Sequence, residues 1–126
     1  MTSFTLNGIT WRIQIVPPLS HYLTDRTGLL RVATTDPDTN RIYLSNRLRG
    51  SFKTRVLLHE LGHATMVSYG LLDELHRFIE PEYWIEAEEW ICNFLADYGR
   101  KIFSVAYKEL GEDAWRVVPM ELDKII

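Results

Sequence analysis

The stretch KTRVLLHELGHATMVSY, residues 53–69, carries the strongest structural signal in the chain and contains the pentapeptide HELGH at residues 59–63. Its apolar residues recur at helical spacing, which predicts an α-helix. Ser51 precedes it as a suitable N-cap, because a serine hydroxyl accepts a backbone N–H at a helix start. Gly70 follows as a suitable C′ residue, because glycine tolerates the left-handed conformation. We therefore expect one long helix between Ser51 and Gly70.

The pentapeptide has the composition of a metal site. His59 and His63 lie one turn apart on the same side of the helix, so both imidazoles can reach one ion. Glu60 lies about a quarter-turn away, where it can act as a base toward a water molecule rather than as a ligand. Glycine in a helix lowers helix stability by about 1 kcal/mol relative to alanine, so its presence at position 62 indicates that another part of the chain packs closely there. The apolar flanks make an idle, solvated face an unlikely explanation.

A catalytic zinc ion takes three protein ligands and leaves one position for water. His21 and His76 are possible third ligands, although a single histidine usually has an ordinary structural explanation. The acid-rich segment EPEYWIEAEEWICN, residues 80–93, is the better source. Its apolar residues recur at helical spacing, so we expect this helix to pack against the rest of the chain.

Within that segment, helical periodicity leaves two candidates. Glu89 lies at the edge of the apolar arc, and Glu88 lies inside it as a competitor. Asn93 follows Glu89 by one turn and can orient a ligand carboxylate or accept from the far nitrogen of a ligand histidine, which favours Glu89. Glu82 and Glu86 fall on the polar side and are expected to be solvated.

The first third of the chain has the pattern of strands. Residues 9–15 alternate between apolar and polar, and Asn7-Gly8 before them suits a tight hairpin turn. Residues 29–34 and 41–45 predict a second antiparallel hairpin. Since strands precede helices, the sequence predicts an α+β fold in which a small antiparallel sheet packs on the helical part.

Further helices are expected beyond the metal-binding stretch. One begins at Pro81 and reaches Gly99, which is either a break or a kink, and another continues to Gly111. The tail, residues 112–126, is expected to hold an extended segment and a short last helix. No repeat or linker divides the chain, so residues 1–126 are expected to form a single domain.

Composition narrows the functional classes. A formal net charge of -3 argues against binding nucleic acid through a general positive field. Cys92, the single cysteine, allows no internal disulfide, and the N-terminus lacks the pattern of a secretion signal. No run is long and apolar enough for a membrane span. We therefore expect a cytoplasmic protein that contacts neither a membrane nor nucleic acid directly.

HELGH followed by an acidic helix with the sequence EWICNFLA resembles the ImmA/IrrE family of small zinc metallopeptidases, a gluzincin-like group common in bacteria and their mobile elements. The resemblance covers residues 41–98. It implies that His59, His63 and Glu89 bind Zn²⁺, that Glu60 is the catalytic base and that Asn93 supports the site. It also implies cleavage of a specific intracellular regulator, such as a mobile-element repressor.

Other interpretations stay open. The chain could be a catalytically silent, metal-holding module that binds a regulatory protein, or a structural zinc site with His76 as fourth ligand. Tyr69, His76 and Tyr83 are possible oxyanion donors, and the sequence favours none of them. The strand at residues 41–45 is a candidate sheet edge for an extended substrate, because it directly precedes the metal-binding helix in the chain.

Overall fold

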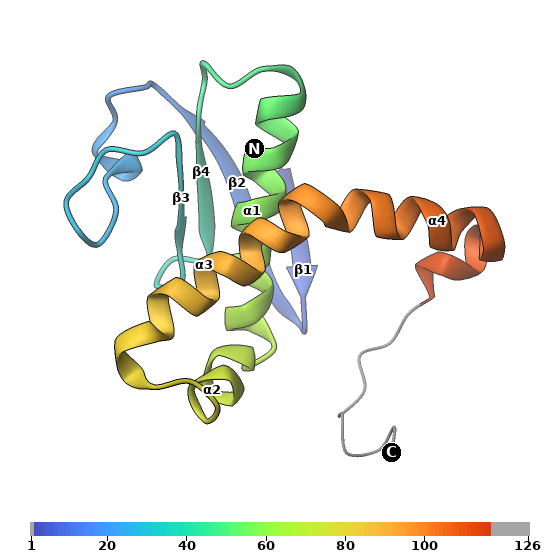
Figure 1. Cartoon of the computed structure of the whole chain (residues 1–126). Coiled ribbons are helices and arrows are strands. Elements are labelled where there is room, and N and C mark those ends of the chain that lie inside the picture. Colours follow the sequence, from blue (N-terminus) through green and yellow to red (C-terminus); the bar gives the residue numbers. More distant parts are fainter. Residues whose placement is uncertain (1, 117–126) are drawn as a thin grey trace.

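The computed structural model describes residues 2–116 and leaves residues 1 and 117–126 outside the described part. Strands come first and helices follow, so the predicted α+β class is confirmed (Figure 1). Most of the expected tail lies outside the described residues. Its described portion includes the 3₁₀ helix η4, Gly111–Trp115.

The N-terminal hairpin forms as the alternation predicts. Strands β1 (Thr2–Leu6) and β2 (Ile9–Val16) pair antiparallel. Asn7 and Gly8 join them with φ angles of 50° and 77°, in the left-handed region that a two-residue hairpin turn requires. The hairpin brings Trp11 into the core, where its side chain is fully buried.

The second hairpin also forms, with a shifted first strand. Strand β3 runs over Ala33–Asp36 rather than residues 29–34, and it pairs antiparallel with β4, Arg41–Ser45. Asp25 holds the residues before β3 in a loop, because its carboxylate accepts the backbone N–H of Leu29 at 3.1 Å. The chain therefore enters the sheet later than the pattern predicts.

The two hairpins join in one mixed sheet of order β1-β2-β4-β3. The expectation of a purely antiparallel sheet is wrong, because β2 and β4 pair parallel. Parallel pairing requires a long connection between the strands, and η1 (His21–Leu23), the loop after it and β3 supply one. It also places β4 inside the sheet, so the expectation that β4 is an open edge is wrong, and the outer strands are β1 and β3.

Helix α1, Gly50–Ser68, packs along this sheet (Figure 1). It begins one residue before the expected N-cap Ser51, with Arg49 at the cap position and no side-chain cap. Its C-terminal end is as predicted, because Gly70 adopts φ 68° and turns the chain into a short helix, α2 (Leu71–His76).

The later helices form one long, continuous run. A 3₁₀ turn, η2 (Pro81–Tyr83), leads into α3 (Trp84–Phe94), a π-helical turn η3 (Leu95–Gly99) and α4 (Arg100–Leu110). Gly99 keeps helical dihedral angles, so the helical run continues through it without a break. Gly111, with φ 60°, ends α4 where the sequence predicts.

The core lies between the sheet and α1. Buried apolar residues from both form one cluster, which comprises Trp11, Ala33, Ile42, Leu44, Leu48, Val56 and Ala64. The indole N–H of Trp11 donates to the Ser68 hydroxyl at 2.7 Å and so ties β2 to the end of α1. No helix in residues 2–116 has the length and hydropathy needed to cross a membrane.

Helix α3 approaches α1 at Gly62. A Cβ added there would lie 3.0 Å from the sulfur and 3.4 Å from the Cα of Cys92. The close packing expected at Gly62 is therefore present, and α3 provides it. This contact sets the distance between the two helices that carry the predicted ligands.

Candidate metal centre

The two histidines of α1 point the same way, as one-turn spacing requires. Their Nε2 atoms lie 3.1 Å apart, and both side chains are largely buried. Two ring nitrogens at this distance can share one proton at most, whereas a cation bound by both would take both lone pairs. The pair is therefore arranged as a two-nitrogen donor set.

Glu89, from α3, completes a group of three. Its two carboxylate oxygens lie 3.0 Å from Nε2 of His59 and 3.1 Å from Nε2 of His63. Hydrogen bonds from His59 and His63 hold the pKa of Glu89 well below its usual value, so this carboxylate is ionised at neutral pH. An anionic oxygen thus faces two nitrogen donors.

The geometry of the three side chains fits a zinc ion. One ligand atom from each of His59, His63 and Glu89 lies within 4.8 Å of the others. Two ligand atoms bonded to a tetrahedral zinc ion at about 2.0–2.1 Å are about 3.3 Å apart. The two Nε2 atoms are 3.1 Å apart, and each lies 3.0–3.1 Å from a different oxygen of Glu89, so the three side chains could hold the metal that the sequence predicts.

Glu88 has a different position from Glu89. Its Oε2 atom lies 2.5 Å from Nδ1 of His63, on the side of the ring away from the three-donor group. Burial disfavours a charged His63, yet hydrogen bonds to Cys92, Glu88 and Glu89 outweigh burial and raise its pKa, so without a metal the ring carries a proton that a cation at Nε2 would displace. Glu88 is therefore placed to orient the candidate ligand His63, in the way that outer carboxylates support metal sites.

Glu60 lies beside the donor group but outside it. It is buried, with 8% of its surface exposed, and it lines the same cavity as His59 and His63. Its Oε2 atom accepts a hydrogen bond of 2.5 Å from the hydroxyl of Thr35 on β3. The sheet thus fixes the orientation of the carboxylate that the sequence analysis names as the base.

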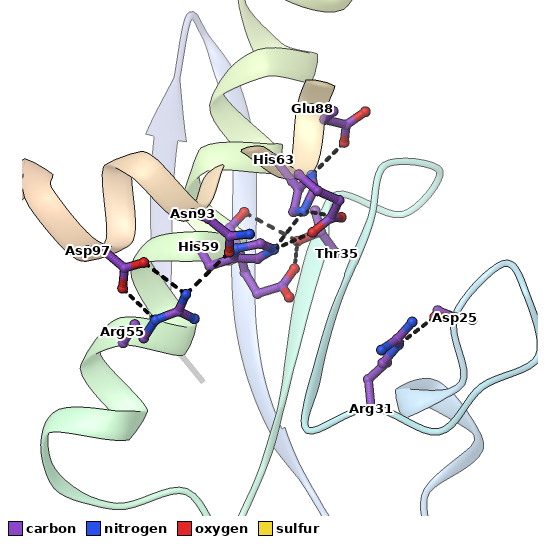
Figure 2. A network of polar contacts seen from close by, with 11 residues as sticks. Asp25, Arg31, Thr35, Arg55, His59, His63, Glu88, Asn93 and Asp97 are labelled. Atoms are coloured by element: carbon purple, nitrogen blue, oxygen red, sulfur yellow. Dashed lines mark hydrogen bonds and ion pairs between the residues drawn. The ribbon is translucent and has the colours of Figure 1, made fainter. Parts of the chain in front are cut away.

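Asn93 has neither of its expected contacts among the described residues. Its side-chain oxygen accepts from Nη2 of Arg55 at 3.3 Å, and Arg55 also forms a salt bridge of 2.6 Å with Asp97 (Figure 2). Nδ1 of His59 is buried and has no hydrogen-bond partner in residues 2–116. Asn93 therefore belongs to a bridge between α1 and the end of α3.

The site opens into a cavity of about 840 Å³. Helices α1 and α3 form one side of it, while residues 21–38 form the other. Arg31 lies on that second side, beside Asp25, and both are drawn in Figure 2. Three residues near the site have no periodic signal in the sequence and were not predicted: Arg31, Thr35 and Arg55. The turn-type sequence DRTG at residues 25–28 predicts the loop alone.

The remaining candidates lie elsewhere or have weaker roles. His21 lines the cavity but is not part of the three-donor group. His76 stacks on Trp84 with ring centroids 3.9 Å apart, so it is not placed as a fourth ligand. Tyr69 and Tyr83 do not line the cavity. Glu82 and Glu86 are exposed, as the sequence predicts.

No family model and no curated protein sequence matches this chain. The resemblance to the ImmA/IrrE family therefore depends on the sequence of residues 41–98, chiefly on the motifs at residues 59–63 and 89–96. The arrangement of the three-donor group and Glu60 does not depend on that resemblance, because it follows from the contacts between α1, α3 and β3.

Proposed function

We propose that this chain is a zinc-dependent endopeptidase of the ImmA/IrrE type, with His59, His63 and Glu89 as the metal ligands. One observation carries the proposal. Three donor atoms converge, while a fourth side chain, Glu60, is buried beside them without belonging to the group. A purely structural zinc site has four protein ligands and no need of a neighbouring free carboxylate.

Zinc supplies Lewis-acid chemistry when bound, because it lets water lose a proton near neutral pH and polarises a carbonyl group. Glu60 accepts the proton of the attacking water and passes it to the leaving amine. Thr35 keeps the Glu60 carboxylate in place, and Glu88 keeps the ring of His63 in place. Arg55 ties α1 to η3 through Asp97, which stabilises the spacing of the two ligand helices.

The cavity offers an extended peptide a place beside strand β3. Strand β3 is an outer strand of the sheet, and its residues Ala33–Asp36 line the cavity next to the site. A peptide added along this edge would pair with backbone groups and bring its carbonyl groups past Glu60. This replaces β4, which lies inside the sheet, as the proposed receiving strand.

We further propose that the substrate is a specific regulatory protein in the cytoplasm, such as a transcriptional repressor of a mobile element. The support is the motif resemblance and the small size of the fold. The alternative is a metal-holding module that binds a regulator without cutting it. The buried, oriented Glu60 favours the enzyme, because a binding role does not require that residue.

The test pairs zinc content with peptide cleavage. The zinc-loaded protein is incubated with a mixed synthetic peptide library, and new peptide ends are identified by mass spectrometry. We expect about one zinc ion per chain in the wild type and in Glu60→Gln. Cleavage should fall about 10²- to 10⁴-fold in Glu60→Gln, as removal of a general base typically does.

Glu86→Gln is the matched control, because it removes an exposed carboxylate of α3 away from the site. It should keep both zinc and cleavage. The binding module would be established instead by two results together. The wild type would bind zinc but cleave no peptide, and Glu60→Gln would keep the full effect of the protein on its regulator.

A further inference from the structure

The loop before β3 is organised around one carboxylate. Asp25 Oδ1 accepts the backbone N–H of Thr27 at 2.8 Å, the hydroxyl of Thr27 at 2.6 Å and the backbone N–H of Leu29 at 3.1 Å. Its other oxygen accepts Nε of Arg31 at 2.6 Å. These bonds fix the direction of the Arg31 side chain, although the loop is exposed.

Arg31 is bound through only one edge of its guanidinium. Nε is engaged by Asp25, whereas Nη1 and Nη2 have no partner among residues 2–116. The side chain is 53% exposed and lines the same cavity as the three-donor group. In Figure 2 the Arg31 side chain extends toward Asp25, apart from the cluster that holds the histidines. Two N–H-bearing nitrogens are thus available to a molecule in the cavity.

The carboxylates of the cavity are mostly engaged already. Glu60 is bound by Thr35, and Glu88 and Glu89 by the histidines. Asp36 accepts the backbone N–H of Asp38 and the hydroxyl of a neighbouring threonine. Among the described lining residues, Asp38 keeps an exposed carboxylate with no partner and Arg31 keeps free charged donors, so a substrate entering here meets one free acidic group and one free pair of donors.

Other arginines do not offer the same arrangement. Arg55 is held by Asp97 and Asn93. Arg26 lines the cavity but has no ion pair or side-chain hydrogen bond in residues 2–116, so no partner fixes its direction. A guanidinium held from one side presents a planar pair of donors, which matches the two oxygens of a carboxylate.

We propose that Arg31 is a specificity residue that binds a carboxylate of the peptide substrate. The inference rests on the proposed function and adds the substrate class to it. The carboxylate belongs either to an Asp or Glu side chain near the scissile bond or to the C-terminus of the peptide. Both sources present the same planar anion to Arg31.

Binding to the uncut complex distinguishes these sources. The zinc-loaded Glu60→Gln variant is titrated by NMR with three blocked peptides, Ac-Ala-Ala-Asp-Ala-Ala-NH2, Ac-Ala-Ala-Asn-Ala-Ala-NH2 and Ac-Ala-Ala-Asn-Ala-Ala-OH. We expect either the Asp peptide or the free-acid peptide to bind about tenfold more tightly than the neutral one. Whichever peptide gains affinity identifies the source of the carboxylate.

The same titration is repeated with substitutions in the loop. Arg31→Gln should abolish the preference, Arg31→Lys should keep part of it because the charge remains, and Arg26→Gln should leave it intact. Unchanged zinc content and unchanged amide spectra away from the loop show that each variant is folded.

Equal affinities for the three peptides overturn the inference, and so does a preference that survives Arg31→Gln or an absence of binding at millimolar peptide. These results leave the proposed function standing if the wild type cuts the peptide library. Failure to bind zinc overturns the proposed function instead, so the two outcomes are distinguishable.

Discussion

The cavity has two walls built on different principles. The helix wall consists of His59, Glu60 and His63 from α1 with Glu88 and Glu89 from α3. Its two histidines and the α3 carboxylates contact one another at 2.5–3.1 Å, whereas Glu60 is bound by Thr35. The loop wall, residues 21–38, is organised by side chains that bind backbone groups, as at Asp25. Substitutions of the histidines, Glu88 or Glu89 should therefore affect the metal, whereas those of Glu60 or of the loop wall should affect substrate binding or cleavage.

The largest effect is expected from the two adjacent glutamates of the helix wall. Glu89→Ala removes a proposed ligand and should lower zinc affinity by more than about a hundredfold. Glu88→Ala removes only the partner of His63 Nδ1 and should cost about 10–100-fold, as outer-shell changes typically do. Competition with a chromophoric chelator measures both affinities.

Glu86→Ala serves as the control in that experiment, since it shortens an exposed acid of the same helix. The order of the two effects decides the assignment. A weaker effect for Glu89→Ala than for Glu88→Ala would make Glu88 the ligand and Glu89 its support.

The contact that joins the two helices provides the second prediction. Gly62→Ala brings a Cβ to 3.0 Å from the Cys92 sulfur and 3.4 Å from its backbone. We expect a loss of about 1–3 kcal/mol in the free energy of unfolding, because overpacking outweighs the better helix propensity of alanine. Urea denaturation of the metal-free protein measures it.

Two further variants test the reason for this loss. Gly62→Ala combined with Cys92→Ala should recover part of the stability, because the sulfur is removed. Gly99→Ala makes the same substitution at a helical glycine where the nearest atom, 2.9 Å away, is the end of the exposed Leu95 side chain. It should cost little, and an equal loss at both glycines would refute the overpacking argument.

The third prediction concerns the bond that crosses from the loop wall to the helix wall. Thr35→Val keeps the shape of the side chain but removes the hydroxyl that binds Glu60. Cleavage of the peptide library should fall about tenfold while zinc affinity stays unchanged, because the base loses its orientation and the ligands do not. Thr34→Val, whose hydroxyl binds the Tyr22 backbone instead, should have no such effect.

The difference between the walls also explains what the sequence could predict. HELGH lies on one helix, so one-turn spacing predicts that His59 and His63 converge. Glu89 and Glu88 are adjacent, and periodicity alone could not separate a ligand from the residue that orients one. The distinction depends on how α3 rotates against α1 at Gly62, which is a tertiary contact.

The sheet shows the same limit of prediction from sequence. The hairpin at Asn7-Gly8 and the left-handed glycines that end α1 and α4 were predictable, because each depends on local backbone preferences. The parallel pairing of β2 with β4 could not be predicted. It joins two strands that are separated by the 24 residues 17–40, and no local sequence pattern signals it. Thr35 takes its position from the β3–β4 hairpin, and Arg31 takes its position from its contact with Asp25.

The smallest expected effect lies in the loop wall and is a pH effect. Hydrogen bonds from Thr27 and Arg31, together with backbone N–H groups, hold the pKa of Asp25 well below its usual value of 3.8. A carboxylate whose folded pKa is depressed adds stability above its unfolded pKa, and that stability is lost as the pH falls through the folded pKa. The loop should therefore stay ordered at neutral pH and loosen only in strong acid.

An NMR titration of the Asp25 carboxyl carbon measures this shift directly. Thr27→Val removes the largest contribution and should raise the pKa of Asp25 more than Arg31→Gln does. Because the carboxylate is exposed, each substitution should alter the order of the loop but leave the free energy of unfolding of the whole chain unchanged. If Asp25 titrates at its usual pKa in the wild type, it does not hold Arg31, and the loop wall has no fixed cation to offer a substrate.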